Sequence, residues 1–120
     1  MKLAVTSQGN NLQSSLDPRF GRAKYFIVVD TETGAFLAAD NTVNLNASQG
    51  AGIQAGKRVA ELGVNGLITG HLGPKAFSTL QAGGVKIYAG ASGTVAEAIE
   101  QFKAGKLQPA ASADVDGHWA

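Results

Sequence analysis

The chain of 120 residues contains no cysteine. This absence excludes disulfide bonds, zinc sites built from thiolates, iron–sulfur clusters ligated by cysteine, and cysteine nucleophiles. A metal bound here would need histidine, carboxylate, methionine or backbone ligands, or would have to bring a ligand set of its own. The absence of cysteine therefore excludes more classes of functional site than any single motif in the sequence does.

The sequence also lacks a large net charge and a long apolar run. Its formal net charge of +1 gives no bulk attraction toward nucleic acid or an anionic membrane. No apolar stretch approaches the roughly 20 residues of a membrane-spanning helix. The residues from Met1 to Leu3 fit the start of a strand better than a signal peptide. We therefore expect a cytoplasmic protein that binds neither nucleic acid nor membrane.

Glycine is abundant, with 16 residues, and many of these stand where a predicted element ends. Apolar alternation and short buried runs predict strands over 2–6, 25–30, 35–40, 66–69 and 85–89. Helical spacing predicts helices over 50–62, 74–82 and 95–103, with Pro74 and the Thr94–Glu97 capping pattern as start signals. The predicted element order is therefore β-β-β-α-β-α-β-α.

This order predicts an α/β fold. Right-handed crossovers place the strands 66–69 and 85–89 parallel to the first strand. We expect a mixed five-stranded sheet of order 3-2-1-4-5, with strand 2 antiparallel and helices on both faces. This is a reduced form of the ribonuclease H-like three-layer arrangement. One domain spans residues 1–108, and residues 109–120, which lack periodicity, are expected to form a loosely ordered C-terminal tail.

Two similar phrases stand where a strand is predicted to run into a helix. They are Gly70-His71-Leu72-Gly73-Pro74 and Gly90-Ala91-Ser92-Gly93-Thr94. A G-x-x-G loop in this place is expected to leave backbone N–H groups unpaired at a helix N-terminus, where a negatively charged ligand is favoured. Two such loops at one edge of the sheet would share a binding surface. The alternative is that both are ordinary strand-to-helix turns.

A third feature is the group of cations Arg19, Arg22 and Lys24, just after the loop that leaves the first strand. The predicted topology places them at the same end of the sheet as the two G-x-x-G loops. Cations there complement backbone N–H donors around an anion. His71 is expected to be exposed, to face the same pocket and to contact a metal or a sulfide. A solvated basic loop and an incidental histidine are the alternatives.

Most catalytic classes lack their residues in this chain. A two-metal nuclease needs several carboxylates at strand ends, and the strands 2–6 and 66–69 carry none. The chain contains neither a G-x-S-x-G elbow nor a G-x-x-x-x-G-K-[ST] loop. The glycines of 50–56 hint at a dinucleotide loop, but their spacing is wrong and close helix packing explains them as well. We expect no enzymatic activity, because no acid–base pair can be assembled.

Four segments and Leu80 occur together in a match that covers nearly the whole chain, to about Lys106. The segments are Phe20–Phe26, Gly50–Ile53, Gly70–Ala76 and Gly84–Tyr88. In this combination they resemble the dinitrogenase iron–molybdenum cofactor biosynthesis family. The resemblance implies the fold described above and a molybdenum–copper sulfide cluster that is bound non-covalently. Charge from the three cations and from Lys75, together with the glycine loops, would then hold the cluster.

One position departs from the family pattern. Many relatives place a histidine immediately before the Phe-Gly-Arg step, where this chain has Arg19. A histidine ligand from this loop is therefore missing, while cationic and hydrogen-bonding contacts to a preformed anionic cluster remain. Molybdenum and copper(I) accept sulfide ligands, so a cluster that carries its own sulfides needs no thiolates from the protein.

The resemblance thus implies a non-catalytic carrier or scaffold for such a cluster, with P-loop ATPases as candidate partners. We expect a monomer. The alternative is an adaptor module that binds a small anion or another protein and holds no metal.

Overall fold

The computed structural model of the chain describes residues 1–41 and 51–111. The strands are β1 (Lys2–Ser7), β2 (Tyr25–Asp30), β3 (Phe36–Asp40), β4 (Gly66–Ile68) and β5 (Lys86–Tyr88). The helices are α2 (Ala51–Glu61), α3 (Pro74–Ala82) and α4 (Val95–Lys103), with a short 3-10 helix η1 (Phe20–Arg22). All eight predicted strands and helices are present, and each end that lies within the described residues differs from its predicted position by at most one residue. Gly50, the first residue of the predicted first helix, lies outside the described residues.

The five strands form one mixed sheet in the predicted order β3-β2-β1-β4-β5. β2 runs antiparallel to both β1 and β3, whereas β4 is parallel to β1 and β5 is parallel to β4. The carboxyl ends of β1, β4 and β5 and the amino end of β2 therefore lie at one edge of the sheet. We call these strand ends the carboxyl edge, as distinct from the two lateral edges of the sheet, which are formed by β3 and β5.

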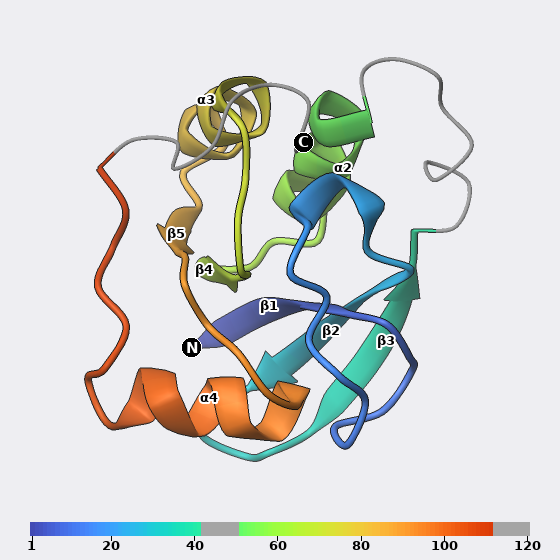
Figure 1. Cartoon of the computed structure of the whole chain (residues 1–120), viewed down its shortest axis with the longest axis vertical. Coiled ribbons are helices and arrows are strands. Elements are labelled where there is room, and N and C mark those ends of the chain that lie inside the picture. The colour runs from blue at the N-terminus through green and yellow to red at the C-terminus, as the bar shows by residue number, and fades with distance from the viewer. Residues whose placement is uncertain (42–50, 112–120) are drawn as a thin grey trace.

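Helices cover both faces of the sheet (Figure 1). Because successive side chains of a strand point to opposite faces, each strand contributes to two cores. On one face, α2, α3 and η1 pack over a core that includes Phe20 and Phe26, whose ring centroids are 5.6 Å apart. On the other face, α4 places Phe102 edge-on against Tyr88, with ring centroids 4.9 Å apart. The architecture is the three-layer α/β arrangement expected from the sequence.

The helices α2 and α3 approach each other closely because glycines stand at their contact. A Cβ atom at Gly56 would lie 3.0 Å from Cβ and Cγ2 of Thr79, and a Cβ atom at Gly83 would lie 2.8 Å from Cβ of Ala60. Gly56 belongs to the stretch that hints at a dinucleotide loop. Its role in the structure is helix packing.

The chain returns along β5 after α4. Pro109 forms an antiparallel bridge with Tyr88, and the N–H of Ala110 donates to the carbonyl of Ile87 at 2.7 Å. Residues 109 and 110, where the sequence predicts the start of a loose tail, are thus held against the outer edge of β5. Residues 112–120 lie outside the described part of the chain. None of the helices described is both long enough and apolar enough to cross a lipid bilayer.

Candidate functional site

Three loops meet at the carboxyl edge. They are residues 8–24 after β1, residues 69–73 after β4, and residues 89–94 after β5. These loops carry all but one of the predicted contact residues, namely Arg19, Arg22, Lys24, Gly70, His71, Gly73, Gly90, Ser92, Gly93 and Thr94. The remaining one, Lys75, lies in the first turn of α3. The fold therefore gathers every predicted contact residue at one edge of the sheet.

The first two loops are joined by their main chains. The N–H of His71 donates to the carbonyl of Pro18 at 2.7 Å, and the N–H of Phe20 donates to the carbonyl of His71 at 3.1 Å. These bonds form a parallel bridge in which Arg19 pairs with His71. The bridge brings a cation and an imidazole into register, although 52 positions of sequence separate them.

Gly70 allows this close approach. A Cβ atom at position 70 would lie 2.7 Å from both Cα and the carbonyl oxygen of Pro18. Both of these atoms belong to the backbone, so no side-chain rotation could make room. The first glycine of the first G-x-x-G loop is therefore needed for the close contact with the loop 8–24, which carries the cations.

Buried polar side chains hold the main chain of the loop 8–24 in place near Arg19. The carboxylate of Asp17, only 7% exposed, accepts the N–H of Arg19 at 3.0 Å. The hydroxyl of Thr6 donates to the carbonyl of Asp17 at 2.8 Å and lies 3.0 Å from the hydroxyl of Thr69. These residues were not predicted as part of the site. Of these residues, only Asp17 is marked in the sequence, because an Asp–Pro pair such as Asp17–Pro18 favours a turn.

The two G-x-x-G loops lie side by side, as the topology predicts. The N–H of Gly90 donates to the carbonyl of Gly70 at 2.9 Å, and the N–H of Ala91 donates to the carbonyl of Thr69 at 3.2 Å. The first N–H groups of the second loop are thus used to hold the loops together.

The N-terminus of α4 is occupied by groups of this chain. The carboxylate of Glu97 accepts the N–H of Thr94 at 3.0 Å, and the Thr94 hydroxyl accepts the N–H of Glu97 at 3.1 Å, which confirms the predicted capping box. The first two N–H groups of the helix donate to carbonyls of the loop 8–16, each at 2.9 Å. The expectation of unpaired N–H groups at this helix end is therefore wrong. Contacts of Ser92, Gly93 and Thr94 with a ligand stay a prediction.

The N-terminus of α3 differs in this respect. Its N-cap residue is Gly73, no side chain caps the helix, and its first turn contains no acidic residue. Pro74 at the first position has no N–H to satisfy. The partial positive charge of a helix N-terminus remains uncompensated by a side chain here, and Lys75 adds a full charge one residue later. Of the two helix ends, this one is suited to an anion.

The cations of the site stand on a fixed main chain. Arg19, Lys24 and Lys75 are exposed, and Arg22 is half-buried in the last turn of η1. The Lys24 carbonyl accepts the N–H of buried Asn41 at 2.8 Å, which ties the amino end of β2 to the end of β3. Charge at this edge is therefore presented by residues whose backbone positions the fold determines.

The donor set limits what the site can hold. Within residues 1–41 and 51–111 no three histidine, aspartate or glutamate side chains come together in a way that could bind a metal ion. His71 is half-buried rather than exposed as expected, and its role as a metal contact stays a prediction. The exposed cations and the uncapped N-terminus of α3 are thus the described features of this edge that suit a negatively charged group.

Comparisons with known proteins agree with this architecture. A family profile described as dinitrogenase iron-molybdenum cofactor matches residues 1–105. The apo form of the orange protein from Desulfovibrio gigas is 43% identical, with a TM-score of 0.92, over 95% of this chain and 96% of that chain. An NMR structure of a Thermotoga protein described as a candidate NifB protein is 38% identical, with a TM-score of 0.82, over 97% of this chain and 98% of that chain.

A sequence relative from Methanocaldococcus jannaschii, itself uncharacterized, is 32% identical over 111 residues, which are 90% of each chain. The profile and the relatives thus cover the same region that carries the sheet, the helices and the three loops. The chain belongs to the dinitrogenase iron–molybdenum cofactor family.

Proposed function

We propose that this protein is a non-catalytic carrier of a preformed anionic molybdenum–copper sulfide cluster, which it binds non-covalently at the carboxyl edge. The family and its structural relatives support a cofactor-binding or carrier role. The observation that carries the proposal further is the N-terminus of α3, which no side chain caps and which lies beside the loop joined to Arg19. The cluster is cargo and brings the metal–sulfur chemistry with it.

Two kinds of contact would bind the cluster: positive charge from the cations and a direct contact from His71. Arg19, Lys24 and Lys75 supply exposed positive charge, and half-buried Arg22 adds charge at the end of η1. Charge-assisted hydrogen bonds to an anion are about twice as strong as neutral ones. His71, whose main chain pairs with that of Arg19, would contact a sulfide or a metal of the cluster through its imidazole. No thiolate is needed, since the sulfides complete the coordination of molybdenum and copper.

The test is reconstitution with tetrathiomolybdate and copper, followed by gel filtration, an absorption spectrum and elemental analysis. We expect visible charge-transfer bands and stoichiometric molybdenum and copper in the protein fraction. The triple variant Arg19→Gln, Arg22→Gln, Lys24→Gln should retain the cluster at least about tenfold more weakly, since one hydrogen bond to a charged group contributes about 1.5–3 kcal/mol.

A matched control separates local charge from net charge. The variant Lys86→Gln, Lys103→Gln, Lys106→Gln removes three exposed cations that lie outside the three loops. Both triple variants lower the formal net charge from +1 by three, so they have the same net charge and differ in where the cations are removed. Equal retention by the two variants would contradict the proposed site. A colourless wild-type protein after reconstitution, with recovery of a protein partner, would favour the adaptor instead.

A further inference from the structure

β3 is an edge strand whose outer side lacks a strand partner among the described residues. The N–H of Asp30 donates to the carbonyl of Ala35 at 2.9 Å, which sets the hydrogen-bond alternation of the β2–β3 pair. In an antiparallel pair, alternate residues direct their N–H and C=O groups toward the neighbouring strand. Leu37 therefore bonds toward β2, whereas the main-chain groups of Phe36 and Ala38 point outward.

The side chains of this strand are unusually apolar for an open edge. Phe36 is 44% exposed and Leu37 is 57% exposed, and Ala38 is exposed beside them. Edge strands commonly carry lysine or proline, which blocks pairing with another chain. β3 has neither, and its single charged residue is Asp40 at the last position.

The opposite edge of the sheet shows the contrast. There the chain covers its own edge, because Pro109 pairs with Tyr88 and the N–H of Ala110 donates to Ile87. Among the described residues, β3 is thus the edge that offers both outward main-chain groups, at Phe36 and Ala38, and exposed apolar side chains.

We propose that β3 pairs antiparallel with β3 of a second copy of this chain, about a twofold axis at Leu37. The outward groups of Phe36 then bond to those of Ala38 in the second copy. Leu37 packs against its own equivalent on the face that carries α2, and each Phe36 ring covers an Ala38 on the face that carries α4. A twofold contact of this kind is self-complementary and closed.

The alternative register, centred on Ala38, is less favourable. It would place Phe36 opposite Asp40 of the second copy, next to a carboxylate, and would pair Leu37 with the smaller Ala39. The register centred on Leu37 instead places the large exposed apolar side chains against apolar neighbours and leaves Asp40 at the end of the paired strands.

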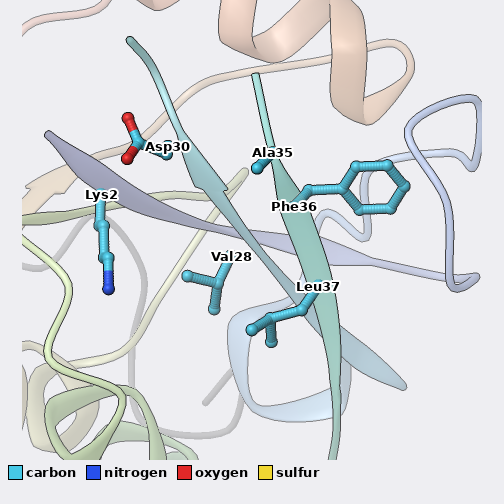
Figure 2. Close-up of a pocket in the computed structure, with 6 residues that line it drawn as sticks. All are labelled: Lys2, Val28, Asp30, Ala35, Phe36 and Leu37. Carbon is cyan, nitrogen blue, oxygen red and sulfur yellow. The ribbon is translucent and has the colours of Figure 1, made fainter. Parts of the chain in front are cut away.

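A hollow beside Leu37 provides room for this contact. It has a volume of about 220 Å³ and is bounded by Lys2, Val28, Asp30, Ala35 and Phe36 (Figure 2). Lys2 and Asp30 are paired in register on β1 and β2. The N–H of Glu32 donates to the Asp30 carboxylate at 2.9 Å and lowers its pKa, so the rim carries one charge of each sign. A second copy meets no excess charge there.

The size of the contact sets its strength. Two strands of five residues bury less than the roughly 1,200 Å² at the lower end of stable interfaces. We therefore infer a weak dimer that depends on protein concentration. This departs from the monomer expected from the sequence and does not rest on the proposed cluster binding.

Because the chain has no cysteine, a single introduced thiol reports the register. Leu37 faces its equivalent as a non-hydrogen-bonded pair, in which Cα atoms lie about 4.5 Å apart, within the range for a disulfide. We expect Leu37→Cys to cross-link under mild oxidation at least about tenfold faster than Lys103→Cys on α4, since pairing raises the effective concentration of the two thiols. Ala38→Cys, whose equivalents are diagonal, should cross-link slowly.

Each other outcome overturns the inference. Faster cross-linking of Ala38→Cys would establish the other register. Equal slow rates for all three variants would show that β3 does not pair. Ala38→Pro provides a check by sedimentation equilibrium, because position 38 donates no N–H to β2 and proline is tolerated at such edge positions. This variant should keep the fold and lose the dimer that the wild-type protein forms at high concentration.

Discussion

Gly70 sets the geometry of the carboxyl edge at the scale of a single residue. Because a Cβ atom there would lie 2.7 Å from two backbone atoms of Pro18, Gly70→Ala must push the two loops apart. We expect a loss of about 1–3 kcal/mol in the free energy of unfolding, the usual effect of overpacking, measured by urea denaturation. The bridge between Arg19 and His71 should weaken as well, so that the variant retains less cluster after reconstitution.

Gly105→Ala is the matched control for this substitution. Gly105 has a φ of +73° and open space around its Cβ position, so alanine there costs about 1–2 kcal/mol through the backbone alone. The control should lose stability and keep normal cluster retention. Wild-type stability and retention in Gly70→Ala would show that the two loops do not need their close approach.

At the scale of elements, the two helices that follow G-x-x-G loops have different roles. The N-terminus of α4 is closed by Thr94, Glu97 and the loop 8–16, whereas α3 has no side-chain cap. Thr94→Ala should therefore lower the free energy of unfolding by about 1 kcal/mol, as loss of an N-cap does. Because the Thr94 hydroxyl is already used in the cap, we expect cluster retention to stay unchanged, in contrast to the ligand contact that the sequence predicts for Thr94. Thermal unfolding and reconstitution measure the two effects separately.

Thr94→Ser keeps a hydroxyl at the cap and should restore most of the lost stability. If Thr94→Ala folds normally but binds the cluster poorly, α4 contributes to the site in the way that its sequence motif predicts. The proposed division between the two helix ends would then be incorrect.

The same elements show what the sequence could and could not predict. Pro74 and the Thr94–Glu97 pattern act locally, and both helix starts were predicted at the residues where the structure has them. The carbonyls of Leu12 and Ser14 that receive the first N–H groups of α4 carry no signal, because every residue has a carbonyl. Buried Asp17 was missed for a related reason, since its partner is a backbone N–H two residues away. The sheet order followed from chain topology, but which N–H groups stay free depended on loop contacts across the fold.

At the scale of the whole molecule, the structure separates two surfaces along β2. The cations that include Lys24 stand at the amino end of this strand, whereas Leu37, the centre of the proposed contact, pairs with Val28 farther along it. Four residues of strand at about 3.4 Å each place these positions about 14 Å apart. This exceeds the Debye length of roughly 8 Å at physiological ionic strength, so charge at one surface is largely screened from the other.

Dimer formation and cluster binding should therefore be independent. We expect the oxidised Leu37→Cys dimer to retain one cluster per chain, with the same affinity as a monomeric Leu37→Ser variant, when both are reconstituted and analysed for molybdenum and copper. Leu37 is 57% exposed and bonds to β2 through its main chain only, so neither substitution should disturb the carboxyl edge. Half a cluster per chain in the dimer would mean that the two copies share a single site. The β3 edge would then belong to the cluster-binding surface.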